Sequence, residues 1–481
     1  MRRFVLLAMM VLLLVAAVPV AAFAQETPVT QGVETLEDVA LAVDTMWVIV
    51  AAMLVLFMQA GFAMLEVGFS RMKNVGSVVA KILAMMGIGF VAFWAAGFAF
   101  AFSEGGGLQS IIGTQGFFLT GPEDAYAGLA WTAVPLSAKF LFQVAFALVS
   151  LAIVWGTMLE RTKFAVYLIF ALVFAGLIYP TVGHWIWGGG WLSTLGMQDF
   201  AGSTVVHLSG AMAALAGTLL LGPRIGKYDD AGNPRTIPGH NMPLAVLGVI
   251  ILWIGWWGFN PGSTMSAVGA SFADIALTTN LAAGAGVLGA MAISYTYRRN
   301  LDVGMMGNGA IAALVAITAA CAFVAPWAAI VIGFVAGMIM YLTLVLVDRI
   351  GVDDPLGAIA AHGMGGIWGT LSTGLFATPA LVESTAIGNP GLFYGGGFGQ
   401  LGVQALGILT CGGFVFITSY VVFALLKAII GLRVKPEEEL NGLDISEHGF
   451  FGYGEQLIAT DQQNGNGRSI AEGPTLKGTS S

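Results

Sequence analysis

The sequence predicts an all-α polytopic membrane protein with eleven transmembrane helices, arranged as an inverted repeat of five plus five helices and one final helix. Of its 481 residues, 57% are hydrophobic and only 10% are charged, whereas a soluble chain carries about 25% charged residues. Apolar runs of roughly 20 residues recur along the chain, and each can cross a hydrocarbon core of about 30 Å. An Asp-x-x-Gly-x-x-x-x-His pattern also occurs in two distant apolar segments.

Composition excludes several classes of protein. The formal net charge is −8, and no basic stretch is long enough to indicate nucleic-acid binding. Cys321 and Cys411 lie in or beside separate apolar runs, where cysteines mostly serve packing. Two cysteines can form neither a disulfide framework nor a closed zinc site. We therefore expect no metal and no cofactor.

The chain begins like a secreted or membrane precursor. Arg2 and Arg3 precede the apolar run Phe4–Val20, and Ala22-Phe23-Ala24 resembles a cleavage site, which predicts a cleavable signal peptide. The alternative is a first helix that is retained. The expected organisation is a signal peptide at 1–24, a short external segment at 25–43, a membrane domain at 44–427 and a cytoplasmic tail at 428–481, whose polar end from 462 onward we expect to be disordered.

The eleven expected spans alternate in the charge of the loops that follow them. They cover 44–66, 75–102, 132–159, 164–182, 202–221, 243–260, 273–297, 304–322, 327–347, 356–377 and 399–427. Lys and Arg residues follow the odd-numbered spans: Arg71, Lys73, Lys81, Arg161, Lys163, Arg224, Lys227, Arg235, Arg298, Arg299, Arg349, Lys427, Arg433 and Lys435. The positive-inside rule then places the N-terminus outside and the C-terminus in the cytoplasm of a multi-pass protein of the cytoplasmic (inner) membrane.

The repeated pattern places two histidines in oppositely directed spans. "DFAGSTVVH" ends at His207 in span five, and "DPLGAIAAH" ends at His362 in span ten. Five spans apart, these segments run in opposite directions, as in an inverted repeat. If Asp199 and Asp354 open their helices, eight residues place each histidine about 12 Å below its helix start. We expect the two rings to face each other near the bilayer midplane; the alternative is a pair of core histidines that satisfy one another.

The chemistry of that midplane favours a neutral solute. No Asp, Glu, Lys or Arg lies in the middle of any expected span, and a charge there costs about 2.5–3.5 kcal/mol even on lenient scales. A neutral imidazole offers one donor and one acceptor, and its ordinary pKa is near 6.5. A small, polar, protonatable solute fits these groups.

Aromatic residues and one hydroxyl gather at the expected outer mouth. Phe142 and Phe146 share one helix face, "HWIWGGGW" precedes span five, and Pro261 and Gly262 should break span six and leave the Ser263 hydroxyl free. Such a set can hold a cation through cation–π contacts; the alternative is an interfacial aromatic belt. To that belt we assign Trp185, Trp191, Trp253, Trp256 and Trp257, and to solvated loops or tail His184, His240 and His448.

Long stretches of the chain resemble ammonium transporters of the Amt/Mep/Rh family, in its Amt branch. They include "AGFAMLEVGFSRMKNV", "GTMLERTKF", "IGWWGFNPGS" and "VDDPLGAIAAHGMGGIWG". The resemblance implies a homotrimer with a pore in each subunit. It also implies the following roles: substrate binding by Phe142, Phe146, Trp187 and Ser263, a pore gate of Phe146 and Phe259, pore histidines His207 and His362, and a structural or proton-route role for Asp199.

The resemblance further implies a transporter for nitrogen metabolism, not an enzyme. Ammonium would bind outside, lose its proton, and pass the histidines as ammonia, while the proton moves separately. The tail would be regulatory, and a PII-family signal protein would bind the cytoplasmic face. Three alternatives remain: an Rh-like gas channel, which generally lacks the Trp and Ser of the outer site; an ammonium sensor; and a haem enzyme with paired histidine ligands.

Overall fold

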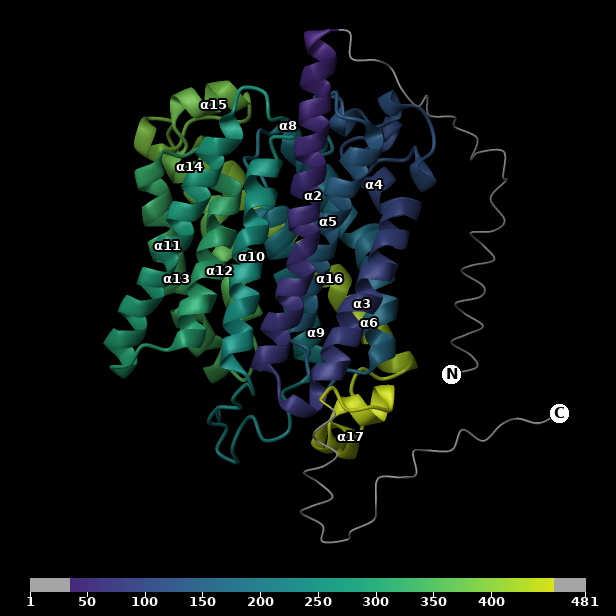
Figure 1. Cartoon of the computed structure of the whole chain (residues 1–481), viewed down its shortest axis with the longest axis vertical. Helices are drawn as coiled ribbons and strands as arrows, with labels where there is room; N and C mark the ends of the chain where they lie inside the picture. The colour runs from purple at the N-terminus through teal and green to yellow at the C-terminus, as the bar shows by residue number, and fades with distance from the viewer. Residues whose placement is uncertain (1–34, 454–481) are drawn as a thin grey trace, which may run out of the picture.

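Helices running side by side form a single bundle (Figure 1). The computed structural model describes residues 35–453, so the expected signal peptide and the end of the tail lie outside the described residues. Within residues 35–453 all regular secondary structure is helical, apart from two isolated β-bridges. Ten of these helices are long and apolar enough to cross a membrane.

The helices match the expected spans within several residues. The first half comprises α2 (Leu36–Phe69), α3 (Val75–Ala92) continued by η3 (Phe93–Gly97) and α4 (Phe98–Phe102), α5 (Leu136–Gly156), α6 (Phe164–Val173) continued by η8 (Phe174–Ile178) and α7 (Tyr179–Ile186), and η9 (Ser203–Leu208) with α9 (Ser209–Leu221). The second half comprises α10 (Met242–Gly262), α11 (Ser271–Arg298), α12 (Val303–Ala320), α13 (Pro326–Arg349), η10 (Ile359–Met364) with α14 (Gly365–Phe376), and α16 (Gly399–Ile429). Short helices α8 (Trp191–Thr194), α15 (Pro379–Thr385) and α17 (Pro436–Asn441) lie at the two ends.

Two details differ from the expected spans. The segment expected as span ten, η10 with α14, is helical but is not one of the ten apolar helices, because glycine, serine and threonine residues dilute its apolar side chains. Helix α2 starts at Leu36, earlier than expected. Thr35 and Asp38 form a capping box there: the Asp38 amide donates to Thr35 Oγ1 at 3.1 Å, and the Thr35 amide donates to Asp38 Oδ2 at 2.9 Å.

The first copy of the repeated pattern has an unusual local structure. Gly202 has φ of 113°, in the left-handed region that favours glycine. Asp199 Oδ2 accepts hydrogen bonds from the amides of Thr204 at 3.0 Å and Val205 at 2.9 Å. The helix begins only at Ser203, with a π-helical turn. Asp199 therefore caps the helix from four residues before its start instead of opening it.

The second copy repeats this arrangement. Gly357 has φ of 76°. Asp354 accepts hydrogen bonds from the amides of Ala358 at 2.9 Å and Ile359 at 2.8 Å, and the helix begins at Ile359, again with a π-helical turn. Each histidine therefore lies close to the start of its helix, and the expected depth of about 12 Å below the helix start was wrong.

Small residues let the helices approach closely. A Cβ atom added to Gly61 of α2 would lie 2.8 Å from Leu252 Cγ of α10, and one added to Gly258 of α10 would lie 2.5 Å from the Ala51 carbonyl oxygen of α2. Such small-residue faces allow van der Waals packing between helices where lipid removes the hydrophobic drive.

Buried charges gather at the end of the bundle that carries α17. Glu160, after α5, pairs with Arg71 at 2.6 Å and with Arg224 at 3.3 Å, and Arg224 also pairs with Asp353 at 2.9 Å. Glu439 accepts a hydrogen bond from the Ile225 amide at 2.7 Å, and it belongs to α17, which lies at this end of the bundle (Figure 1). The loops after expected spans one, three, five and nine therefore meet at one end of the molecule.

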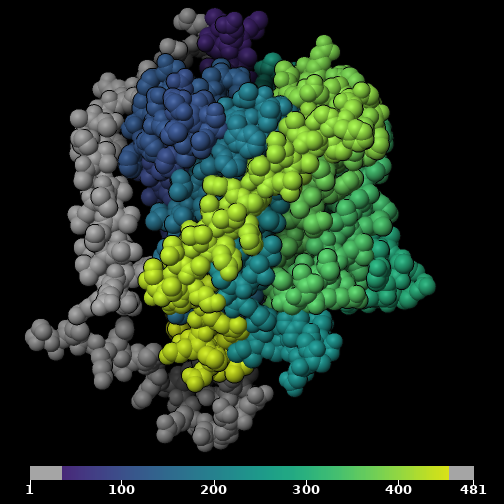
Figure 2. Space-filling model, turned by 180° about the vertical axis from the view of Figure 1, so that it is seen from behind, coloured from purple at the N-terminus to yellow at the C-terminus, as the bar shows by residue number. Residues whose placement is uncertain are grey.

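The C-terminal part of the chain covers one side of the bundle. Figure 2 shows α16 running obliquely across the back of the molecule toward this end. Lys81 was counted among the cations that follow span one, but it falls within the expected span 75–102 and lies in α3, where it is buried and forms an ion pair with Glu66 of α2.

Candidate functional site

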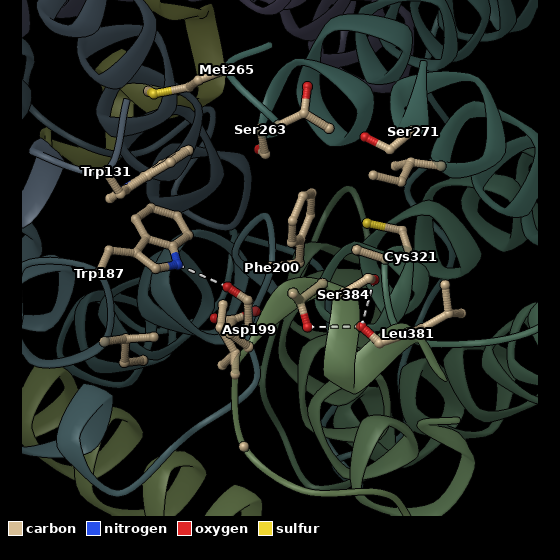
Figure 3. Close-up of a pocket in the computed structure, with 18 of the residues that line it drawn as sticks. Trp131, Trp187, Asp199, Phe200, Ser263, Met265, Ser271, Cys321, Leu381 and Ser384 are labelled. Atoms are coloured by element: carbon tan, nitrogen blue, oxygen red, sulfur yellow. Dashed lines mark hydrogen bonds between the residues drawn. The ribbon is translucent and has the colours of Figure 1, made fainter. Parts of the chain in front are cut away.

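A cavity of about 1140 Å³ opens at the end of the bundle opposite α17. We call it the vestibule. Phe142, Phe146, Trp187, Asp199 and Ser263 all line it, and Figure 3 shows Trp187, Asp199 and Ser263 around it. The structure thus brings together every residue that the sequence predicted for outer substrate binding.

Trp187 is held in place by the residues that precede His207. Its Nε1 donates a hydrogen bond to the Asp199 carbonyl oxygen at 2.8 Å (Figure 3). A Cβ atom on Gly202 would lie 3.0 Å from the Trp187 ring and 2.7 Å from Val206. Glycine is therefore needed at this position for the indole to lie against the start of η9.

The Ser263 hydroxyl is not free, contrary to the sequence prediction. Helix α10 continues through Pro261 to Gly262, and Ser263 Oγ donates to the Phe259 carbonyl oxygen at 2.8 Å. This bond uses the only proton of the hydroxyl and leaves its lone pairs as acceptors. Ser263 can therefore accept an N–H from a cation in the vestibule.

Three phenylalanines close the floor of the vestibule. The ring centroids of Phe142 and Phe146 are 4.6 Å apart, and those of Phe146 and Phe259 are 4.2 Å apart. Phe146 also meets Trp187 edge to face at 6.2 Å. Phe259 is fully buried and lies beyond the vestibule lining. A solute that leaves the vestibule in this direction must pass between closely packed rings.

The two histidines lie directly beyond Phe259. The His207 and Phe259 rings stack at 5.4 Å, and the Nδ1 atoms of His207 and His362 are 3.2 Å apart. Both side chains are buried, with exposed fractions of 0% and 5%. Among the described residues His207 Nε2 has no hydrogen-bond partner, so it is available to a solute.

This contact leaves no space for a haem between the histidines. Axial ligands bind iron from opposite sides of a flat macrocycle, whereas here the His207 and His362 nitrogens contact each other and the ring centroids are 5.2 Å apart. The geometry does not fit the haem alternative.

Comparisons with known proteins identify the family. Residues 46–453 match the model of the Ammonium Transporter Family. The chain belongs to the ammonium transporter family. It is 47% identical over 437 residues to ammonium transporter Amt2 of Archaeoglobus fulgidus, covering 88% of this chain and 91% of that relative. It is 35% identical to the ammonium transporter of Bacillus subtilis, covering 86% and 99%.

Solved structures agree with this assignment. A protein named "Sensor Amt Protein" superimposes with a TM-score of 0.78 at 35% identity, covering 86% of this chain and 100% of that one. Candida albicans Mep2 superimposes with a TM-score of 0.76 at 28% identity, covering 89% and 93%.

In this family member, one tryptophan that we assigned to the aromatic belt lies inside the bundle, against His207. Trp256 is fully buried, stacks on His207 at 5.5 Å and donates from Nε1 to Thr318 Oγ1 at 3.0 Å. Trp256 and Phe259 are three residues apart in α10 and thus share a helix face. That spacing was the signal in the sequence that could have placed Trp256 beside the pathway.

Of the three histidines that we assigned to solvated loops or the tail, His184 was wrongly assigned. His184 is fully buried at the end of α7, with Nδ1 3.1 Å from the Ala101 carbonyl oxygen and Nε2 2.7 Å from that of Gln109. His240 and His448 are half-buried. His240 Nδ1 lies 2.9 Å from the Ser70 carbonyl oxygen, and the His448 ring packs on Phe164. None of the three histidines is among the residues that line the vestibule.

Asp199 connects the parts of the site. Its carbonyl oxygen binds Trp187, and its carboxylate caps the helix of His207 through Oδ2. Oδ1 has no hydrogen-bond partner within residues 35–453. This geometry fits an orienting role between vestibule and pore.

Proposed function

We propose that this member of the ammonium transporter family moves ammonium across the cytoplasmic membrane along the path just described. One observation carries the proposal: the vestibule, the Phe146–Phe259 pair and the His207–His362 pair follow one another in contact. Only a solute that is small and can shed its charge suits all three parts.

Ammonium would first bind in the vestibule. The faces of Phe142, Phe146 and Trp187 attract a cation, with about 0.5–2 kcal/mol per contact, and the Ser263 lone pairs accept one N–H. The packed phenylalanines below exclude water, so an uncompensated charge becomes costly there. Ammonium therefore gives up its proton at this point and continues as ammonia.

Ammonia would then pass along the histidines. The unpartnered Nε2 of His207 offers a hydrogen bond to ammonia, which both donates and accepts. Trp187 and Ser263 favour this recruiting mechanism over that of an Rh-like gas channel. The proton moves by a separate route, with Asp199 at its entrance.

The proposal includes an orientation and an assembly. We place the α17 end in the cytoplasm because Arg71, Arg224 and Arg433 gather there. We count η10 with α14 as an eleventh span, and the repeated Asp–Gly–His geometry supports two inverted halves. By resemblance, the protein forms a homotrimer with a pore per subunit.

A PII-family protein is the proposed cytoplasmic partner. The candidate surface comprises the loop 224–240 and Arg298–Asn300, and both include exposed residues at the same end as α17. A pull-down with and without nucleotide and 2-oxoglutarate tests this partner, and failure to bind under every condition would remove it.

The test of transport uses the purified protein in liposomes. An inward ammonium gradient should evoke a current. It should also change the pH of the lumen faster than it does in protein-free liposomes. Sensing is a second candidate because the solved "Sensor Amt Protein" superimposes over its full length. Saturable ammonium binding without any flux would favour the sensor.

A further inference from the structure

A second, much smaller cavity lies beyond His362, toward the α17 end. His362, Glu66, Asn308 and Gly357 are among its lining residues. Glu66 is in the last turns of α2, shortly before Arg71 of the buried charge cluster. The cavity therefore lies between the histidine pair and the proposed cytoplasmic surface.

The size of this cavity matches one small molecule. Its volume is about 20 Å³, and by this measure roughly 10–15 Å³ suffices for one water. Ammonia is about as large as water, so one molecule of either fits. Most of the lining is aliphatic, with Leu65, Ile153 and Ile311 among it.

Glu66 has an unsatisfied acceptor at this place. Its Oε2 is paired with Lys81, but Oε1 has no hydrogen-bond partner among the described residues. The side chain is only 1% exposed. A buried carboxylate oxygen without a donor costs free energy, so this oxygen calls for an N–H or O–H donor that the chain does not supply.

The other polar side chain of the cavity is already occupied as a donor. Asn308 Nδ2 donates to the Leu356 carbonyl oxygen at 2.9 Å. Gly357 keeps the space open, because a Cβ atom there would lie 3.0 Å from Asn308 Nδ2. A solute in the cavity thus meets His362, Glu66 and the remaining amide groups of Asn308, and of these Glu66 Oε1 is the buried acceptor that has no donor among the described residues.

We propose that Glu66 forms an exit binding site, where Oε1 accepts an N–H hydrogen bond from the solute that leaves His362. Lys81 occupies Oε2 in the ion pair and leaves Oε1 as the acceptor that the chain does not use. The proposal rests on ammonium transport and on the orientation given above. It makes Glu66 a substrate-binding residue on the cytoplasmic side.

The test compares the two directions of transport in liposomes that hold the protein in one orientation. The variant Glu66→Met/Lys81→Met removes both charges of the pair and leaves no acceptor at the position of Glu66, while the side chains keep a similar volume. We expect the half-saturating ammonium concentration on the cytoplasmic side to rise at least fivefold. The value on the vestibule side should stay within twofold, and the unfolding temperature in detergent serves as the control for a structural effect.

Several outcomes decide the matter. Equal shifts on both sides, or no shift in a folded variant, would overturn the exit site while leaving ammonium transport intact. Absence of flux in the unaltered protein would instead overturn the proposed function. If the double variant does not fold, Ala152→Val decides, because it narrows the same cavity without touching the ion pair; an unchanged cytoplasmic constant there would contradict the proposal.

Discussion

His207 Nδ1 lies 3.2 Å from His362 Nδ1, and this contact joins two helices whose starts are built alike. One nitrogen must donate and the other accept, so at most one Nδ1 carries a proton. Two imidazolium rings cannot share this bond, and both rings are buried. The pair therefore offers a solute neutral donors and acceptors and supplies no negative charge that would balance a cation.

Replacing Ser263 with alanine should weaken recruitment of ammonium. The variant loses the acceptor in the vestibule, and one hydrogen bond contributes about 0.5–1.5 kcal/mol, which corresponds to a rise of roughly twofold to tenfold in the half-saturating concentration. Saturable ammonium current measures it. The control is Ser271→Ala, another vestibule serine, which should leave the value unchanged; equal effects from both would argue against a specific site.

Replacing Gly202 with alanine should destabilise the protein and displace Trp187. The residue has φ of 113°, and a Cβ atom there meets Val206 at 2.7 Å, so we expect a loss of roughly 1–3 kcal/mol. Thermal unfolding in detergent measures this. Gly226→Ala is the matched control, since Gly226 also has positive φ but faces open space; a similar loss in both would mean that backbone strain alone acts.

Replacing Trp256 with leucine should impair the pathway, because the indole stacks on His207 and bonds Thr318. We expect a lower unfolding temperature and a slower maximal rate of ammonium flux, as large buried side chains contribute about 3–5 kcal/mol. The neighbouring Trp257 is 49% exposed, so Trp257→Leu should change neither. If the Trp256 variant showed a normal ammonium flux, this result would contradict a role of Trp256 in the transport pathway.

Much of this site could be predicted from the sequence because its signals are local. The Asp–Gly–His pattern, the Phe142–Phe146 spacing and the Trp187 and Ser263 motifs each lie within a few residues. The structure brings all of these residues to one path. The orientation of a side chain such as Trp256 depends on packing between helices, and near a helix end it resembles an interfacial residue.

Long-range pairs could not be predicted in the same way. The ion pair of Lys81 could not be predicted, because nothing nearby in the sequence reveals that Glu66 of another helix faces it. His184 looked solvated because its two partner carbonyls, of Ala101 in α4 and of Gln109 in the loop that follows, are distant in the sequence. The early start of α2, by contrast, did have a local signal in Thr35 and Asp38.

Acid should destabilise the protein through the buried charge cluster at the α17 end. Burial raises the pKa of Asp353, but Arg161 and Arg224 outweigh it and lower that pKa to about 2, from 3.8. Because the folded pKa is depressed, the stabilisation is complete above the unfolded value near 4 and is lost as the pH falls toward 2. Unfolding temperatures between pH 5 and pH 3 should therefore decline.

The variant Asp353→Asn provides the control for this pH dependence. It should be less stable at pH 6 by about 2 kcal/mol, and its unfolding temperature should decline less steeply between pH 5 and pH 3. An identical slope in both proteins would assign the acid sensitivity to other groups, such as Glu160, whose pKa is also lowered by Arg224 and Arg71 against the effect of burial.

The most direct measurement is the ammonium-evoked current of His207→Ala/His362→Ala in liposomes, recorded beside that of the unaltered protein with potassium as the competing cation. Our account predicts that the unaltered protein gives a current with ammonium and none with potassium. In the variant this selective ammonium current should disappear. A current of undiminished size and equal selectivity would contradict it.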